Sequence, residues 1–312
     1  MKVLVTGGAG FIASHIVDKL IEQEFEVICV DNLSSGKKEN VNPKAVLYEE
    51  DITSTQLRDI FDVEKPDYVI HQAAQIDVQR SITDPNHDAY INIIGTINLL
   101  ENCKNFGVKK LVYASSAAVY GNPNYDVVDE LHPIAPLSPY GISKYVPEFY
   151  IKTYNHAFDL NYTILRYSNV YGIRQVVKGE GGVIAIFVDK LLKNEPLVVY
   201  GDGSQTRDFI NVSDIAEANV QALHYGDNHV FNVSRNEKIN INELIGILSK
   251  IKGEPISPIY KPFRTGDILH SCLSNEKALS LLNWVPKVSL EEGLLKTINY
   301  YQKKEELIPL SY

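Results

Sequence analysis

The sequence predicts an α/β protein built around a doubly wound parallel sheet. Strand-like and helical stretches alternate from residue 1 to about residue 166, which is typical of a parallel sheet with helices on both faces. The first strand runs directly into a glycine-rich turn, and the second ends in an acid about twenty residues later. These two features place the sheet in the Rossmann class. The pattern then loosens, which predicts a smaller α/β domain at the C-terminal end.

The expected strands are short runs of apolar residues. In the first half they cover 2–5, 27–30, 46–48, 68–71, 111–114 and 162–165, and the clearest helices cover 11–23, 92–106 and 140–158. In the second half we expect helices over 183–193, 213–225 and 241–251, and strands over 197–200 and 230–233. We therefore expect two domains, 1–170 and 171–312, with the segment around 207–233 able to return to the large sheet.

The turn over residues 6–10 has the features of a phosphate site. Its backbone N–H groups can approach a phosphate, and the helix that begins at Phe11 adds the positive end of its dipole. Gly7 and Gly10 lack a Cβ, which permits a tight turn and a close approach of a pyrophosphate. Ala13 stands at the third position of the pattern, where a methyl group is tolerated. We expect the turn, with Phe11 and Ile12, to bind a dinucleotide.

Asp31, at the end of the second strand, indicates which dinucleotide is bound. A carboxylate there accepts hydrogen bonds from both hydroxyls of an adenosine ribose and repels a 2′-phosphate, so it favours NAD over NADP. Taken alone, Asp31 is equally consistent with a solvated acid at a turn, and the glycine turn upstream decides for NAD. Asp51 and Ile52, after the third strand, are candidate adenine contacts.

The composition is that of a soluble globular enzyme. The formal net charge of -9 argues against nucleic acid or an anionic membrane as the main partner. Cys29, Cys103 and Cys272 are scattered singly, without a paired framework or metal-ligand spacing. No apolar leader and no run of about 18 apolar residues occurs in the sequence. We therefore expect a cytoplasmic protein without a metal.

A second group of residues is suited to acid–base chemistry. Tyr140 and Lys144 stand four apart at the start of an expected helix, which places both side chains on one face. An ammonium near a phenol favours the phenolate, so we expect Lys144 to lower the pKa of Tyr140 toward neutrality. Such a phenol can take a hydroxyl proton, and Ser115 or Ser116 can hydrogen-bond the same oxygen and relay the proton. Pro147 is expected to kink the helix.

These motifs resemble those of the extended short-chain dehydrogenase/reductase superfamily, and within it the NAD-dependent nucleotide-sugar epimerases of the UDP-glucose 4-epimerase type. The resemblance covers nearly the whole chain. Its motifs in the first half are Thr6-Gly-Gly-Ala-Gly-Phe-Ile12, Asp31-Asn-Leu-Ser-Ser-Gly36, His71-Gln-Ala-Ala74, Asn92-Ile-Ile-Gly95, Ser115-Ser-Ala-Ala-Val-Tyr-Gly121, Tyr140-Gly-Ile-Ser-Lys144 and Arg166-Tyr-Ser-Asn169. Those in the second half are Gly201-Asp-Gly203, Arg207-Asp-Phe209, Arg264-Thr-Gly-Asp267 and Asn283-Trp-Val-Pro286.

The resemblance implies roles for the matching residues. Tyr140 would be the general base, Lys144 would tune it and bind the nicotinamide ribose, and Ser116 would be the proton shuttle, with Ser115 as the near alternative. Further NAD contacts are implied for Asn32, Ser35, Gly36, Gln72, Ala73, Ala74 and Asn92. Besides Ser116 and Tyr140, substrate contacts are implied for Asn169 (sugar or first phosphate), Tyr200 (uracil), Arg207 and Arg264 (pyrophosphate), Asp267 (ribose) and Ser271 (sugar wall).

The activity that the resemblance implies is the interconversion of UDP-glucose and UDP-galactose through a 4-keto sugar. Ser271 stands where glucose-restricted epimerases carry a tyrosine, so we expect UDP-N-acetylglucosamine to be accepted as well; a shift of one in the alignment would put His270 or Cys272 there. An epimerase of a uronic or dTDP-activated sugar and a 4-keto reductase stay open. A non-enzymatic NAD-binding protein is disfavoured by the intact catalytic residues. A homodimer through the helices over 92–106 and 140–158 is also implied.

Overall fold

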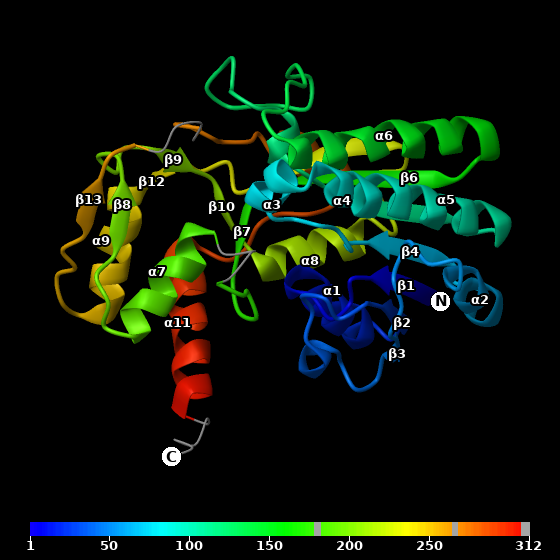
Figure 1. Cartoon of the computed structure of the whole chain (residues 1–312), viewed down its shortest axis with the longest axis horizontal. Helices are drawn as coiled ribbons and strands as arrows, with labels where there is room; N and C mark the ends of the chain where they lie inside the picture. The colour runs from blue at the N-terminus through cyan, green and yellow to red at the C-terminus, as the bar shows by residue number, and fades with distance from the viewer. Residues whose placement is uncertain (178–181, 264–267, 307–312) are drawn as a thin grey trace.

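The computed structural model describes residues 1–177, 182–263 and 268–306. Its centre is a seven-stranded sheet in the order β11-β6-β5-β4-β1-β2-β3, in which every neighbouring pair is parallel (Figure 1). This confirms the predicted doubly wound α/β class. The order reverses between β1 and β4, and ligands of such sheets bind at this switch point, outside the carboxyl ends of the strands. The strands are β1 (Lys2–Thr6), β2 (Glu26–Val30), β3 (Val46–Tyr48), β4 (Tyr68–His71), β5 (Lys110–Ser116), β6 (Asn161–Tyr167) and β11 (His229–Val233).

Helices cover both faces of the sheet because each strand alternates its side chains. In β1, Val3 and Val5 join a core with α1 (Phe11–Glu22) and α8 (Val212–Gln221). Leu4 joins a core on the other face with α2 (Leu57–Glu64) and α5 (Gly95–Asn105). The long helix α6 (Pro139–Phe158) lies beside α5 in this second layer (Figure 1). Burial on both faces explains why the strands read as unbroken apolar runs.

The second half of the chain adds smaller sheets and a separate apolar core. The core is formed with α7 (Val183–Leu192), α9 (Ile241–Lys252) and α11 (Leu290–Glu306). The small sheets pair β7 (Asn169–Tyr171) with β10 (Phe209–Asn211), β8 (Val198–Tyr200) with β13 (Ile259–Lys261), and β9 (Thr206–Arg207) with β12 (Ile239–Asn240). The short helices and turns are η1 (Lys38–Asn40), α3 (Val78–Thr83), α4 (Pro85–Ala89), η2 (Tyr90–Ile94), η3 (Ala117–Val119) and α10 (Glu276–Leu281).

Part of the second half contributes to the large sheet. β11 pairs with β6 at one edge, and α8 packs against α1. Both elements come from the segment around 207–233. The division of the chain into domains at residue 170 stays a prediction. Within the described ranges, no helix is both long enough and apolar enough to cross a membrane.

A buried ion pair attaches α6 to the sheet. Arg166 of β6 donates to both carboxylate oxygens of Glu148, at 3.0 and 2.7 Å, and Ser115 of β5 donates to the same carboxylate at 2.7 Å. Glu148 is 0% exposed and Arg166 3%, and a buried charge needs this complete set of partners. Glu148 directly follows Pro147, which removes one backbone hydrogen bond. Pro147 does not end the helix: α6 continues past it to Phe158.

Candidate functional site

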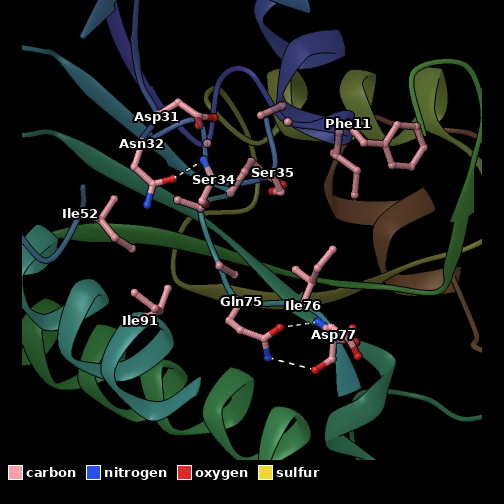
Figure 2. Close-up of a pocket in the computed structure, with 18 of the residues that line it drawn as sticks. Phe11, Asp31, Asn32, Ser34, Ser35, Ile52, Gln75, Ile76, Asp77 and Ile91 are labelled. Atoms are coloured by element: carbon pink, nitrogen blue, oxygen red, sulfur yellow. Dashed lines mark hydrogen bonds between the residues drawn. The ribbon is translucent and has the colours of Figure 1, made fainter. Parts of the chain in front are cut away.

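A cavity of about 540 Å³ lies at the carboxyl ends of β1, β2, β4 and β5 (Figure 2). Its volume is in the range of small-molecule sites. The structure therefore brings the glycine turn, the acid of β2 and the tyrosine of α6 to one space. The predicted residues that line it are Gly7, Gly10, Phe11, Ile12, Asp31, Asn32, Ser35, Asp51, Ile52, Gln72, Ala73, Ala74, Ser116 and Tyr140.

The glycine turn forms a cradle at the start of α1. Gly7 has a φ of +70°, and a Cβ there would lie 2.9 Å from the Ala73 nitrogen, so this position requires glycine. Gly10 donates to the Gly7 carbonyl at 2.9 Å. Gly10 also caps α1 without any side-chain hydrogen bond, which leaves N–H groups of the first turn available to an anion. This cradle fits the pyrophosphate of a dinucleotide.

The backbone holds the carboxylate of Asp31. Oδ2 accepts from the Ala9 N–H at 2.9 Å, and Oδ1 accepts from the Leu33 N–H at 2.8 Å. Burial raises the pKa of Asp31, and these two bonds offset part of the rise. A Cβ on Gly36 would lie 3.0 Å from Oδ1, so a side chain at this position would crowd the carboxylate; Gly36 itself does not line the cavity. A fixed carboxylate here suits the hydroxyls of an adenosine ribose, and the site therefore fits NAD.

A polar rim continues from Asp31 toward Asp51. Asn32 Oδ1 accepts from the Ser34 N–H at 3.0 Å (Figure 2). Asn32 Nδ2 donates to Asp51 Oδ2 at 2.6 Å. These bonds order the loops after β2 and β3 around the same end of the cavity. The contacts of Asn32, Asp51 and Ile52 with the cofactor stay predictions.

Ser115 and Ser116 have different partners because neighbouring strand residues point in opposite directions. Ser115 donates to Glu148 at 2.7 Å. Ser116 Oγ accepts from the Ala118 N–H at 3.2 Å, and the Ser116 hydroxyl lies close enough to Tyr140 to lower the pKa of its phenol. Since this oxygen accepts from the backbone, its own proton is available to the Tyr140 phenol oxygen. Of the two serines, Ser116 is therefore the one placed to act with Tyr140.

Burial dominates the titration of Tyr140 and Lys144. Burial raises the pKa of Tyr140, the hydrogen bond with Ser116 lowers it, and Asp88 raises it. Burial lowers the pKa of Lys144 to about 8, against a raising effect of Asp88 and Glu148. The expected lowering of the Tyr140 pKa by Lys144 is not found in this structure: burial raises the pKa, and the group that lowers it is Ser116.

Asn92 lies behind the cavity rather than in its wall. It stands in η2, a π-helical turn, and such turns often mark functional sites. Its Oδ1 accepts from the Gln75 N–H at 2.8 Å, and its Nδ2 donates to Ser143 Oγ at 2.8 Å. Asn92 thus joins the loop after β4 to α6. Direct contacts of Asn92 and Lys144 with NAD stay predictions.

Sequence reasoning missed the wall that follows Ala74. Gln75 Oε1 accepts from the Asp77 N–H at 2.6 Å, and its Nε2 donates to the Asp77 carbonyl at 3.0 Å (Figure 2). A signal was present, because residues just beyond the carboxyl end of a strand at the switch point face the ligand. The further lining residues are Ala13, Val30, Ser34, Glu50, Gln75, Ile76, Asp77, Arg80, His87, Ile91, Ser115, Tyr167, Ser168, Val170 and Gln175.

The predicted substrate residues of the second half gather around β9, outside this wall. Arg207 Nη1 donates to the Thr206 carbonyl at 2.8 Å, and the Ser271 N–H donates to the same carbonyl at 3.3 Å. The Tyr200 carbonyl accepts from Gln205 Nε2, just before β9, at 2.8 Å. Outside the described residues lie Arg264 and Asp267. The roles of these five residues stay predictions.

Asp208 anchors the region around β9, and sequence reasoning gave it no role. Its carboxylate is 0% exposed and accepts from three backbone N–H groups, those of Arg235, Asn236 and Leu273. Burial raises the pKa of Asp208 to about 6, against the lowering effect of these bonds. The Asp208 carbonyl accepts from Asn169 Nδ2 at 3.2 Å, which places Asn169 beside Arg207.

Comparison with known proteins decides the family. Residues 3–234 match the model of the NAD dependent epimerase/dehydratase family. The chain belongs to this family. NAD is accordingly its cofactor, and the glycine cradle and Asp31 are the residues that fit it.

Members of the family resemble the chain over its whole length. A putative UDP-glucose 4-epimerase of Methanocaldococcus jannaschii is 50% identical over 299 residues, which cover 96% of the chain and 97% of the relative. A crystal structure of UDP-glucose 4-epimerase with UDP-glucose from Thermotoga maritima has a TM-score of 0.95 at 46% identity, covering 98% of the chain and all of the other. A UDP-N-acetylglucosamine 4-epimerase from Methanobrevibacter ruminantium has a TM-score of 0.93 at 37% identity, covering 97% and 98%.

The two serines of β5 are expected to differ in their effect on epimerase turnover. Ser116→Ala removes the hydroxyl that lowers the pKa of Tyr140 and should lower kcat by about 100-fold or more. Ser115→Ala removes one bond to Glu148 and should lower the free energy of unfolding by about 1–2 kcal/mol, with a smaller loss of kcat. Steady-state kinetics and denaturant unfolding of both variants measure this. A larger loss of kcat in Ser115→Ala than in Ser116→Ala would reverse the assignment.

Proposed function

We propose that the protein is an NAD-dependent UDP-glucose 4-epimerase, which interconverts UDP-glucose and UDP-galactose through a 4-keto intermediate. The observation that carries the proposal is that Ser116 and Tyr140, whose hydroxyls interact, line the same cavity as the glycine cradle and Asp31. The full-length similarity to proteins named for this activity supports it. A bound dinucleotide beside an acid–base pair suits the oxidation of a sugar hydroxyl and the reduction of the resulting ketone, with no net consumption of the cofactor.

The residues of the chain supply binding, orientation and proton transfer. Bound NAD supplies the hydride acceptor and donor. Tyr140 takes the proton of the C4 hydroxyl and later returns it, and Ser116 hydrogen-bonds the same phenol oxygen and lowers its pKa. The Lys144 ammonium favours the phenolate by its charge. Asp31 and the glycine turn keep the dinucleotide in place while the 4-keto sugar rotates within the cavity to present its opposite face.

The proposal assigns the nucleotide end of the substrate to the region around β9. Arg207 supplies positive charge for the pyrophosphate, which the net charge of -9 does not provide. Asn169, beside it, contacts the sugar or its first phosphate, and Tyr200 shapes the uracil pocket. Because Asp208 ties this region together through three backbone bonds, these side chains form one unit. Arg264 and Asp267 are assigned to the pyrophosphate and the ribose from the sequence alone.

The activity is tested by incubating the protein with UDP-glucose and catalytic NAD and following C4 inversion by proton NMR. We expect UDP-galactose to form without accumulation of reduced cofactor. Tyr140→Phe should lower kcat by about 100-fold or more, as expected for loss of a general base, while NAD stays bound. Stoichiometric consumption of added cofactor would identify a reductase instead. Conversion of only uronic or dTDP-activated sugars would contradict the proposed substrate.

We also propose that UDP-N-acetylglucosamine is accepted. The proposal rests on the small side chain of Ser271 and on the similarity to a UDP-N-acetylglucosamine 4-epimerase. Of the alternative wall positions, Cys272 is 2% exposed and its thiol lies 3.7 Å from Asp208, so it has no free face toward a sugar. His270 contacts Thr206 at 3.1 Å and is exposed.

Ser271→Tyr should therefore lower turnover of UDP-N-acetylglucosamine by about tenfold or more, because the larger side chain removes the space for the acetamido group. Turnover of UDP-glucose should stay within about threefold of the parent. NMR assays with both sugars measure the ratio, and His270→Tyr serves as the matched control. Loss of the N-acetylated substrate in His270→Tyr alone would move the wall to residue 270.

We further propose a homodimer through α5 and α6. The two helices pack together, and exposed apolar side chains lie on α6 and on η2, which leads into α5: Ile142, Phe149 and Tyr150 on α6, and Tyr90 and Ile94 on η2. Large exposed apolar side chains on neighbouring helices favour association. Light scattering coupled to size exclusion should give twice the 35.0 kDa of one chain. Ile94→Glu combined with Tyr150→Glu should give the mass of one chain, and a wild-type monomer would contradict the proposal.

A further inference from the structure

Asp88 is a buried carboxylate with incomplete hydrogen bonding. It stands in α4 and is 1% exposed. Its Oδ1 accepts from Gln75 Nε2 at 2.7 Å and from Asn92 Nδ2 at 3.3 Å. Its Oδ2 has no hydrogen-bond partner among the described residues. Buried polar atoms are normally paired, and a buried charge without a full set of partners needs a reason.

The partners of Asp88 lead to the catalytic helix by two routes. Through Asn92 the network reaches Ser143, the neighbour of Lys144, at 2.8 Å. Through Gln75 it reaches Asp77, whose side chain caps α3. Ser81 of α3 then accepts from the Tyr140 N–H at 3.1 Å. Asp88 is therefore linked to the first two turns of α6, beside Lys144 and at the Tyr140 backbone.

The charge of Asp88 also bears on Lys144. The groups around Lys144 are Asp88 from α4, Glu148 and Tyr140 from α6, His71 from β4 and Tyr113 from β5, over whose ring Nζ lies at 4.8 Å. Burial and Lys144 lower the pKa of His71 to about 3, so this ring is neutral. Burial raises the pKa of Tyr113, so its phenol is neutral too.

Only the two carboxylates of this group can balance the ammonium. Glu148 is already paired with Arg166 at 2.7 Å. Asp88 has no ion pair of its own among the described residues, and both carboxylates oppose the lowering of the Lys144 pKa, whose value is about 8. Asp88 is therefore the uncommitted negative charge near Lys144.

We propose that Asp88 is a positioning residue for the proposed epimerase reaction: it holds the Gln75–Asn92 amide pair against α6 and supplies the buried negative charge that balances the Lys144 ammonium. This inference rests on the proposed function. Asp88 itself does not line the cavity, so it acts through Asn92, Gln75 and Lys144 and not on the substrate.

Asp88→Asn is a selective test because of the orphaned oxygen. An amide oxygen can keep the two bonds of Oδ1, and replacing Oδ2 by NH₂ breaks no hydrogen bond. The variant thus removes the charge with little change of shape. Asp84→Asn is the matched control, because Asp84 is exposed, caps the same helix through the His87 N–H at 3.1 Å, and asparagine caps equally well.

The first readout is the pH dependence of kcat for UDP-glucose. Without Asp88 the pKa of Lys144 falls below about 8, so the ammonium is lost at lower pH. We expect the alkaline limb of the profile to move down by about one pH unit, with KM within about threefold of the parent. The Asp84→Asn profile should coincide with the parent. An equal loss of kcat at every pH in Asp88→Asn would indicate a merely structural role and overturn the proposal.

The second readout does not need turnover, so it stands even if the proposed activity fails. Thermal unfolding of the NAD-loaded protein is measured for Asp88→Asn, Lys144→Met and the double variant. In the parent, Asp88→Asn should lower the midpoint because Lys144 loses its counter-charge. In the Lys144→Met background, Asp88→Asn should raise the midpoint, because the Asp88 carboxylate is then a buried charge without a counter-charge. The same shift in both backgrounds would show that the two residues are not coupled.

Discussion

The ion pair of Glu148 and Arg166 is the constraint on which the site depends. Tyr140 lies on α6 and Ser116 at the end of β5, so the interaction of their hydroxyls depends on how the helix packs on the sheet. The pair lies about two helical turns beyond Tyr140 and joins α6 to β6, while Ser115 joins it to β5. Two desolvated charges are stable only when their partners are complete. The same contacts that complete the ion pair therefore also set the position of the part of α6 that carries Tyr140.

Much of the site could be predicted because it lies at regular elements. The glycine turn follows β1, Asp31 ends β2, and Tyr140 and Lys144 share one helical face, so period and spacing were sufficient. The choice between Ser115 and Ser116 was not accessible, because both meet α6 and only the packed structure shows that Ser115 reaches Glu148 and Ser116 reaches Tyr140. The rise in the Tyr140 pKa was likewise missed, since burial is a property of packed layers and leaves no mark in a four-residue spacing.

The residues that sequence reasoning missed act across segments distant in the chain. Gln75 and Asp77 lie in a loop without periodicity, and their importance follows from a bond to Asn92 seventeen residues on. Asp88 stands in a helix of five residues, where an acid would ordinarily be solvated. Asp208 follows Arg207, and sequence reasoning assigned a role to the arginine alone. The Asp208 carboxylate nevertheless joins its own segment to those around residues 235 and 273. Such roles arise from tertiary contacts that no local pattern records.

The return of β11 to the sheet has a consequence for how the chain can be divided. A fragment ending at residue 170 would lack β11 and α8, so β6 would become an outer strand of seven residues with unpaired backbone groups, and the apolar side of α1 would be open to water. Exposed strand edges of that kind recruit other chains. The large sheet is thus completed by residues from the second half of the chain, and a truncated or fused gene keeps the whole sheet only if it extends through β11.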